Sequence, residues 1–524
     1  MARKALWISA LASGLLLVAS GTVLAGGGPT QVSSPPSPYA AACASSDGSQ
    51  PGHVYVNGTE EPQLAVSGSN MIAMWHQDRW SNGGAHGIGV GYSTTGGASW
   101  TETTIPWSAC SGATDPNGIG QYLRNSDPWV SFGPDGTAYA SALAFNVVSP
   151  NNANAVVAAT SSDGGKTWNN VKAIPGSIFP NAQNGTDKNS TTADPVTAGT
   201  AYTVWDTLAS PTDNPDDRIH AAAYSGPAFF SKTTDGGQTW SNATIIFNSK
   251  NRQQTIGNII VVDPSTTPHT LYDFFDDITS PNTPIQGVRS SAAIAFAKSA
   301  DGGTTWSQPQ IIAPFNSLGV IDPNTGARLR VGDGLEEVAR DASTGALYVV
   351  WESSSNYQKQ LKQSSAAWDD QILLTSSTNG GATWSTPQSI DIGNNGLPAF
   401  TPTVAAGNGR VAVTYYDSRN LQQGQTNVMP TDYWARVSNN GGATFGSEQR
   451  LTGVSFDVMS APVARGFFLG DYEGLQPSGS GFEALFVKTN CDAPYTSAFC
   501  GPASSNTAPT PNIDPTDVFS AAIS

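Results

Sequence analysis

Charged side chains are scarce in this sequence, and so are histidine, cysteine and methionine. Of its 524 residues, 12% are Asp, Glu, Lys or Arg, with only 5 His, 4 Cys and 5 Met. The cysteines form no CxxC pair of the kind that ligates zinc or exchanges disulfides. No GxSxG, HExxH or P-loop segment occurs, so the sequence lacks the motifs of α/β-hydrolases, zinc peptidases and P-loop nucleotide-binding proteins.

Basic residues are also few relative to acidic ones. Lys and Arg number 24 against 40 Asp and Glu, which gives a net charge of −16. This balance argues against a nucleic-acid partner and against an anionic membrane surface. After residue 25 no apolar run is long enough to cross a bilayer, so we expect no membrane partner once the leader is removed.

The N-terminal segment predicts export. Residues 1–25 combine a basic start, an apolar stretch and small residues before Gly26, as in a cleaved signal peptide. Residues 26–50 are rich in Gly, Pro, Ser and Ala and predict a flexible leader, followed by one domain over residues 51–524. We expect a soluble monomer, secreted or periplasmic.

Four cysteines fit an oxidising compartment. Cys43 and Cys110 lie in the N-terminal part, and Cys491 and Cys500 lie close together near the C-terminus. We expect structural disulfides paired within each group, although four cysteines allow three connectivities.

One octapeptide recurs six times. Its clearest copy, residues 161–168, reads SSDGGKTW. The others are STTGGASW at 93, TTDGGQTW at 233, SADGGTTW at 299, STNGGATW at 377 and SNNGGATF at 438. Asp or Asn beside Gly-Gly suits a tight turn, because the side chain accepts backbone N–H groups and glycine adopts positive φ. A regular period indicates a repeat architecture.

Short strand signals surround each copy of the octapeptide. Residues 194–247 contain the runs AYTVWD, AFFS and ATIIF, whose alternation and aromatic content are typical of strands. Four strands per repeat predict an all-β fold, a β-propeller of antiparallel blades. Seven blades are favoured and six are the alternative. We expect C-terminal strands and His53–Val56 to complete the last blade, which removes a free sheet edge.

The repeated S-x-D-x-G-x-T-W pattern resembles the Asp-box (BNR-repeat) proteins of the sialidase superfamily, over roughly residues 55–524. This resemblance implies a propeller with the boxes on turns between third and fourth strands. In such proteins the boxes are structural, and we interpret all six in this way. The fold alone does not imply sialidase activity.

Topology directs the search for a site to the face opposite the boxes. There the first strands begin and the second strands end. We align the first-strand positions as Glu61, Asp127, Asp194, Asn258, Leu335, Thr401 and Asp471. The second-strand ends carry further acids and arginines, so charge is expected to concentrate around one mouth of the channel.

The resemblance implies three arginines that hold a carboxylate, a Tyr nucleophile assisted by a Glu, and an Asp acid/base. By strand-end position, the substrate-binding candidates are Arg79, Arg330 and Arg419, and the catalytic candidates are Tyr416, Glu352 and Asp78. The hypothesis is an exported sialidase-like glycoside hydrolase acting on an extracellular glycan or glycoprotein.

The alternative is a non-catalytic propeller that binds glycan or protein through the same face. In that interpretation the acids bond backbone N–H groups of neighbouring blades, and the arginines are neutralised by nearby acids. No metal or other cofactor is predicted. The acidic stretches 213–217 and 273–277 offer oxygen ligands for Ca²⁺, but solvated loops are favoured there.

Overall fold

The computed structural model describes residues 23–24, 28–39, 43, 51–147, 153–181, 184–209, 225–250, 252–279, 291–332, 334–357, 368–393, 396–501 and 514–524. In these residues the chain is built from β-strands, with short 3-10 turns at η1 (Ile119–Gln121) and η3 (Val458–Ser460). The prediction of an all-β chain is confirmed. Within the described part, no helix is both long and apolar enough to cross a membrane.

The first three groups of strands follow one another along the chain. Unit 1 comprises β3 (Val54–Ser67), β4 (Asn70–Trp80), β5 (Ala85–Ser93) and β6 (Thr101–Thr104). Unit 2 comprises β7 (Arg124–Phe132), β8 (Ala138–Phe145), β9 (Asn154–Ser161) and β10 (Asn169–Ala173). Unit 3 comprises β11 (Asn184–Ala193), β12 (Ala201–Ala209), β13 (Ala228–Thr233) and β14 (Thr244–Phe247). Strand order within each unit is sequential and antiparallel.

Four further units complete the series. Unit 4 comprises β15 (Gln253–Asp263), β16 (Thr270–Thr279), β17 (Ser291–Ser299) and β18 (Gln310–Pro314). Unit 5 comprises β21 (Glu337–Arg340), β22 (Leu347–Ser353), β23 (Gln371–Ser377) and β24 (Gln388–Ser389). Unit 6 comprises β25 (Ala399–Gly407), β26 (Arg410–Asp417), β27 (Pro430–Ser438) and β28 (Gln449–Arg450). Unit 7 comprises β31 (Gly474–Ser478), β32 (Gly481–Thr489), β33 (Thr516–Ile523) and β2 (Thr30–Gln31).

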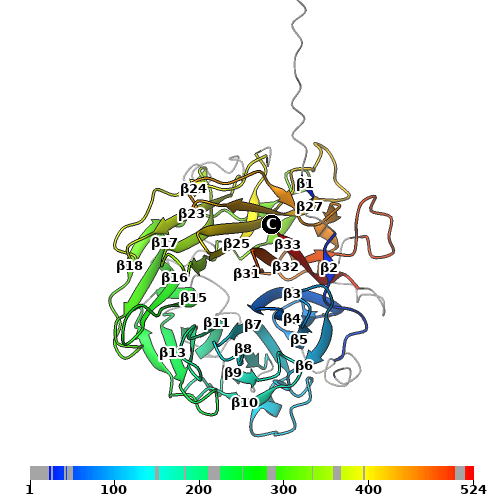
Figure 1. The fold of residues 1–524 in the computed structure, drawn as a ribbon. Coiled ribbons are helices and arrows are strands. Elements are labelled where there is room, and N and C mark those ends of the chain that lie inside the picture. The colour runs from blue at the N-terminus through cyan, green and yellow to red at the C-terminus, as the bar shows by residue number, and fades with distance from the viewer. Residues whose placement is uncertain are drawn as a thin grey trace, which may run out of the picture.

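The units are arranged around a common centre (Figure 1). First strands such as β7, β11, β15 and β25 lie toward that centre, and outer strands such as β10 and β18 lie at the periphery. Apolar side chains pack between neighbouring units: Ile72 and Val90 of unit 1, for example, share a core with Val130 and Val157 of unit 2. Burial of these surfaces holds the units together.

Short strands outside this series add to the edges. β1 (Val23–Leu24) pairs in parallel with β28, and β29 (Phe456–Asp457) pairs with β27. A small sheet consists of β19 (Val320–Ile321), β20 (Arg328–Arg330) and β30 (Phe467–Phe468). Arg330 pairs with Phe468 in the parallel β20–β30 register, which fixes where this arginine lies.

All six octapeptides form the turns between third and fourth strands, and the side chains at their first and third positions make local hydrogen bonds. In the copy at 161–168, Ser161 Oγ accepts the Gly165 N–H at 2.9 Å and donates to Asp163 Oδ1 at 2.8 Å. Asp163 Oδ1 also accepts the Thr167 N–H at 3.0 Å. Asn440 replaces the aspartate in the last copy and accepts the corresponding N–H at 2.9 Å. These side chains therefore stabilise the turn from within, while backbone carbonyls of the same turns also accept bonds from neighbouring units, as Gly442 O does from Gln388 Nε2 at 2.7 Å.

Five first strands carry a β-bulge at the same place, with a positive-φ residue in the bulge. These residues are Glu61, Asp127, Lys188, Gly257 and Thr401, with φ of 51°, 50°, 41°, 80° and 48°. A bulge inserts one residue and re-aims its side chain. The alignment of Asp194 with this set is wrong: Lys188 is the equivalent residue, and Asp194 follows β11 at its other end. The Asp194-Pro195 pair imitates Asp127-Pro128, whereas Lys188 precedes an asparagine.

The strand that completes unit 7 differs from the expected one. β2 pairs with β33, whereas Val54 and Tyr55 pair with Trp80 and Arg79 inside unit 1. Because unit 1 uses the hydrogen bonds of that segment, it is not available to unit 7. Residues 30–39, predicted to be a flexible leader, are instead packed: Ser33 Oγ donates to Asp517 Oδ1 at 2.6 Å, and Tyr39 Oη donates to Ile88 O at 2.6 Å.

Two disulfides join the cysteines as expected, Cys43 with Cys110 and Cys491 with Cys500. Residues 273–277 lie within β16 rather than in an acidic loop, and residues 213–217 lie outside the described residues.

Candidate functional site

A cavity of about 400 Å³ opens at the strand ends opposite the octapeptide turns. First-strand residues of units 1 to 4 line it, together with second-strand ends and the small β20–β30 sheet. Its basic side chains are Arg79, Lys188, Arg330 and Arg465. Its acidic side chains are Glu61, Asp127, Asp187, Asp276 and Asp471. We call it the cluster cavity.

Lys188 lies at the centre of the charge cluster. Its Nζ is 2.8 Å from Asp471 Oδ2, 3.3 Å from Glu61 Oε1 and 3.8 Å from Asp127 Oδ1. The side chain is only 9% exposed. Burial alone would lower the pKa of Lys188, but the surrounding carboxylates raise it well above its ordinary value. The ammonium is therefore charged and joins units 1, 2, 3 and the start of unit 7.

Glu61, His76 and Asp127 form the wall beside Lys188. His76 Nε2 lies 3.0 Å from Glu61 Oε2 and accepts the Asp127 N–H at 2.9 Å. Burial lowers the pKa of His76, so its imidazole is neutral at pH 7. Burial raises the pKa of Asp127 to about 8. Burial also acts on Glu61, but the Lys188 ammonium outweighs it and holds the pKa of Glu61 well below its ordinary value. Two adjacent carboxyls thus differ in protonation.

The spacing of this wall would also suit a metal ion. Glu61, His76 and Asp127 each offer a ligand atom, and these atoms lie within 4.8 Å of one another. However, the Lys188 ammonium already contacts Glu61 and lies near Asp127, so it supplies the positive charge that a divalent ion would bring. The residues here fit an internal lysine better than a resident metal.

Two arginines flank one aromatic ring at the rim. The guanidinium carbons of Arg330 and Arg79 lie 4.1 Å and 5.1 Å from the centre of the Phe468 ring. Arg330 Nε donates to Asp471 Oδ1 at 3.2 Å, and Arg79 Nε lies 2.6 Å from Glu60 Oε2. Each of these two arginines is therefore paired with an acid, while its position at the cavity is fixed by ring contacts.

Arg465 differs from them. It lies in an exposed position at the cavity, has φ of 67°, and forms no salt bridge with any acid in the described part of the chain. Partial burial and the neighbouring charge of Arg330 lower the pKa of Arg465 to about 10, at which it stays protonated at pH 7. It is the lining cation best placed to accept an added anion.

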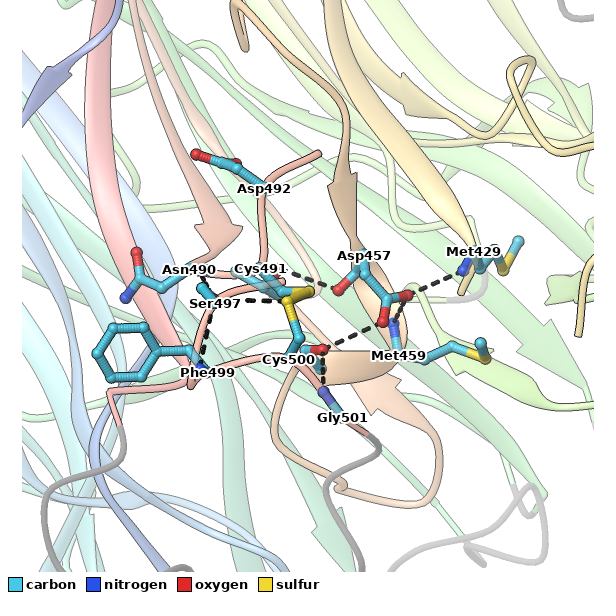
Figure 2. The surroundings of a disulfide bond; sticks show 12 residues. Met429, Asp457, Met459, Asn490, Cys491, Asp492, Ser497, Phe499, Cys500 and Gly501 are labelled. Atoms are coloured by element: carbon cyan, nitrogen blue, oxygen red, sulfur yellow. Dashed lines mark hydrogen bonds between the residues drawn. A yellow bond between two sulfur atoms is a disulfide. The ribbon is translucent and has the colours of Figure 1, made fainter. Parts of the chain in front are cut away.

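The Cys491–Cys500 disulfide anchors the segment that leads to Arg465 (Figure 2). The Asp457 N–H donates to Cys491 O at 2.9 Å. The Asp457 carboxylate accepts the N–H groups of Met429 at 2.8 Å and Met459 at 3.1 Å, which caps η3. The chain continues from η3 directly into the loop that carries Arg465. A covalent link and a capped turn thus fix one end of this loop.

Asp78, the predicted acid/base, lies away from the cluster cavity. It is fully buried, with Oδ1 accepting the Asn57 N–H at 2.8 Å and Oδ2 accepting Ser37 Oγ at 2.6 Å. Its Oδ2 also lies 2.9 Å from His86 Nδ1. These contacts tie the N-terminal segment to unit 1.

The predicted nucleophile Tyr416 and its partner Glu352 are also outside the cavity. Tyr416 is 0% exposed, its ring is centred 4.4 Å from that of Tyr433, and its hydroxyl lies 2.8 Å from Glu473 Oε1. Glu352 Oε1 accepts the Thr401 N–H at 2.6 Å, which joins unit 5 to unit 6. A bond of this kind, from an acid to a backbone N–H of the neighbouring unit, is expected if the acids at the strand ends have a structural role.

Arg419 does not line the cavity that Arg79 and Arg330 line. It pairs with Asp417 and Glu448, and its guanidinium carbon lies 3.9 Å from the Trp434 ring centre. Of the six predicted site residues, the structure brings only Arg79 and Arg330 together in the cavity. Position along a strand could be inferred from sequence, but not which second-strand side chains line the cavity, as Arg79 does, and which bond within or between units, as Arg419 and Glu352 do.

Two central residues were missed by the sequence reasoning, Lys188 and Arg465. Lys188 could have been found by aligning Asp187-Lys188-Asn189 with Ser126-Asp127-Pro128 on the repeat period. Arg465 lies in an insertion between units 6 and 7, where the repeat offers no alignment.

No family model and no curated protein matches the chain. Solved structures resemble it weakly. An α-L-arabinanase from Penicillium chrysogenum, complexed with arabinobiose, is 13% identical over 74% of this chain and 93% of its own, with a TM-score of 0.42. A variant of the NanB sialidase from Streptococcus pneumoniae is 11% identical over 89% of this chain and 68% of its own, with a TM-score of 0.42. Because these scores are low, no conclusion about fold or activity rests on them.

Proposed function

We propose that this chain is an exported seven-bladed β-propeller of the Asp-box type that binds an acidic extracellular glycan in the cluster cavity. The observation that carries the proposal is the position of Arg465 beside Arg330 at the cavity, without an acid partner in the described residues. The signal-like residues 1–25 and the six octapeptides support export and the propeller class.

The chemistry of the lining suits a sugar acid. A guanidinium binds a carboxylate through two parallel N–H bonds, and Arg465 forms no salt bridge in the described residues, although the charges of Asp471 and Asp187 act on it. Asp187 and Asp276, which also line the cavity, can accept hydrogen bonds from sugar hydroxyls. A volume of about 400 Å³ is of the size that takes a small ligand.

A second candidate function is hydrolysis of the bound glycan. It is favoured by Glu61 and Asp127, because a protonated and an ionised carboxyl side by side can serve as acid and as nucleophile or base. In this scheme Asp127 would protonate the leaving glycosidic oxygen, and the Glu61 carboxylate would act on the other side of the bond. Tyr416, Glu352 and Asp78 have no role in it, because they do not line the cavity.

The test compares two arginines in the purified mature protein. Binding to an array of acidic glycans, followed by titration of the best ligand, is measured for the unmodified protein, Arg465→Ala and Arg419→Ala. We expect Arg465→Ala to weaken Kd about 10- to 100-fold, the cost of losing a charged hydrogen-bond donor. Arg419→Ala is the matched control, since Arg419 is paired elsewhere. Equal loss in both variants, or no glycan bound at all, contradicts the proposal.

Turnover of a fluorogenic sialoside separates the two candidates. Hydrolysis that is lost in Asp127→Asn while binding persists establishes the hydrolase. Binding without turnover by the unmodified protein establishes the non-catalytic propeller.

A further inference from the structure

A second, smaller cavity lies between the first strands, at the centre of the ring of units. Its volume is about 20 Å³, and we call it the channel cavity. It is lined by residues of units 2 to 5 and by Tyr472, including Asn189, Asn258, Glu336 and Glu337. A cavity of this size has room for about one water molecule or one ion.

The two asparagines present oxygen atoms that lack a partner in the described residues. Asn258 Nδ2 donates to Asp273 Oδ2 at 2.9 Å, and Asn189 Nδ2 donates to Ser141 Oγ at 2.8 Å. These bonds fix both amide groups. The remaining carbonyl oxygens, Asn258 Oδ1 and Asn189 Oδ1, are buried and accept no hydrogen bond from the described part of the protein. A buried acceptor left in this state is costly.

Glu336 has the same lack of donors. It is 1% exposed, and no N–H or O–H group of the described residues donates to its carboxyl oxygens, which lie beside the Asp276 carboxyl. Glu337, which is 9% exposed, lines the same cavity. No Lys or Arg of the described residues forms a salt bridge with either glutamate. Lys188 also lines the cavity, but its ammonium contacts Asp471 and Glu61.

We propose that the channel cavity binds one hard cation of the Ca²⁺ class through oxygen atoms of Glu336, Asn258 and Asn189, with Glu337 as a second carboxylate. Carboxylate and amide oxygens are the ligands that Ca²⁺ prefers, and no nitrogen or sulfur ligand is needed. A water molecule donates only two hydrogen bonds, too few for the two asparagine oxygens and the Glu336 oxygens together. The site is separate from the cluster wall of Glu61, His76 and Asp127, and it does not rest on the glycan proposal.

Calcium alone is the first probe. The mature protein is treated with a chelator, dialysed and melted with and without CaCl₂. We expect Tm to rise by about 3 °C once Ca²⁺ exceeds its Kd about a hundredfold, because the ion binds only the folded state. Tb³⁺ is the second probe. Trp129 and Tyr472 line the cavity and should sensitise its emission, and Ca²⁺ should displace it.

Two variants make the test specific. Glu336→Gln should lose both the Tm shift and the Tb³⁺ emission, and the matched control Asp135→Asn, an exposed turn carboxylate, should keep both. Absence of both signals in the unmodified protein would overturn the proposal. So would signals of the same size in Glu336→Gln, because the ion would then bind elsewhere. Since Glu336 is outside the cluster cavity, glycan binding provides an independent check that this variant is folded.

Discussion

The two ends of the strands differ in the sequence separation between a polar side chain and the residues to which it bonds. At the octapeptide turns, the side chains at the first and third positions bond to residues at most four positions away, as Asp163 does to Thr167. At the opposite end, Lys188 reaches Glu61 across 127 residues and Asp471 across 283. The repeated sequence therefore builds repeated local turns, whereas the charged cluster is assembled from positions that differ between units.

The two ends of the strands also shift the pKa of an aspartate in opposite directions. Asp301 is an exposed turn residue, and hydrogen bonds from the Thr305 hydroxyl and N–H lower its pKa to about 2. Asp127 is buried in the cluster, and burial raises its pKa to about 8. Water and local donors stabilise the first carboxylate; the interior penalises the second. Identical residue types thus acquire opposite properties at the two ends.

The largest expected effect comes from removing the centre of the cluster. Lys188→Met leaves Glu61 and Asp471 without their shared ammonium, and we expect a loss of about 3 to 5 kcal/mol in the free energy of unfolding. Chemical denaturation measures it. Lys172→Met is the control, because Lys172 is a partly exposed residue of an outer strand. A loss below about 1 kcal/mol for Lys188→Met would contradict the central role of this residue.

A smaller effect is expected inside the sheets. Tyr416→Phe removes a hydroxyl that lies 2.8 Å from Glu473 Oε1 and accepts the Val487 N–H at 3.1 Å. We expect about 1 to 3 kcal/mol of destabilisation, with glycan affinity and any turnover unchanged. Thermal denaturation and ligand titration are read together. Loss of glycan binding or turnover at unchanged Tm would show that Tyr416 belongs to the functional site.

A serine variant in an octapeptide turn tests whether the bonds of one turn act independently of the other turns. Ser161→Ala removes the three bonds of its hydroxyl, and we expect a loss of about 1 kcal/mol. Because Ser161 and Ser299 belong to units 2 and 4, which are not neighbours, the effects of Ser161→Ala and Ser299→Ala should add within about 0.5 kcal/mol in the double variant. Marked non-additivity in denaturation experiments would show that the turns are coupled.

The smallest effect is a change in titration. Thr305→Val removes a hydroxyl that donates to Asp301 Oδ2 at 2.6 Å, so the pKa of Asp301 should rise from about 2 toward its ordinary 3.8. The folded pKa is depressed, so the stabilisation that it represents is complete above pH 3.8 and is lost as pH falls through about 2. Carboxyl NMR titration measures both values, and an unchanged pKa would refute the assignment.

Much of the fold could be predicted, because the octapeptide marks each third-to-fourth-strand turn. The closing strand could not: His53–Val56 and Thr30–Gln31 are both short segments near the N-terminus, and pairing inside unit 1 decides between them. Of the six predicted site residues, two line the cluster cavity. Arg79 and Arg330 reach the cavity, but Arg419 has equally close acids within its own unit and remains there.

The sequence by itself determined the all-β character and the six octapeptide turns, since these depend on bonds between residues a few positions apart. The tertiary structure alone decided that Lys188 is shared by Glu61, Asp127 and Asp471, and that Arg465 stands beside Arg330. Those neighbours come from different units, and a bulge of one residue sets which side chain faces the centre. Local propensity carries no information about such contacts, because they are fixed only when the units pack together.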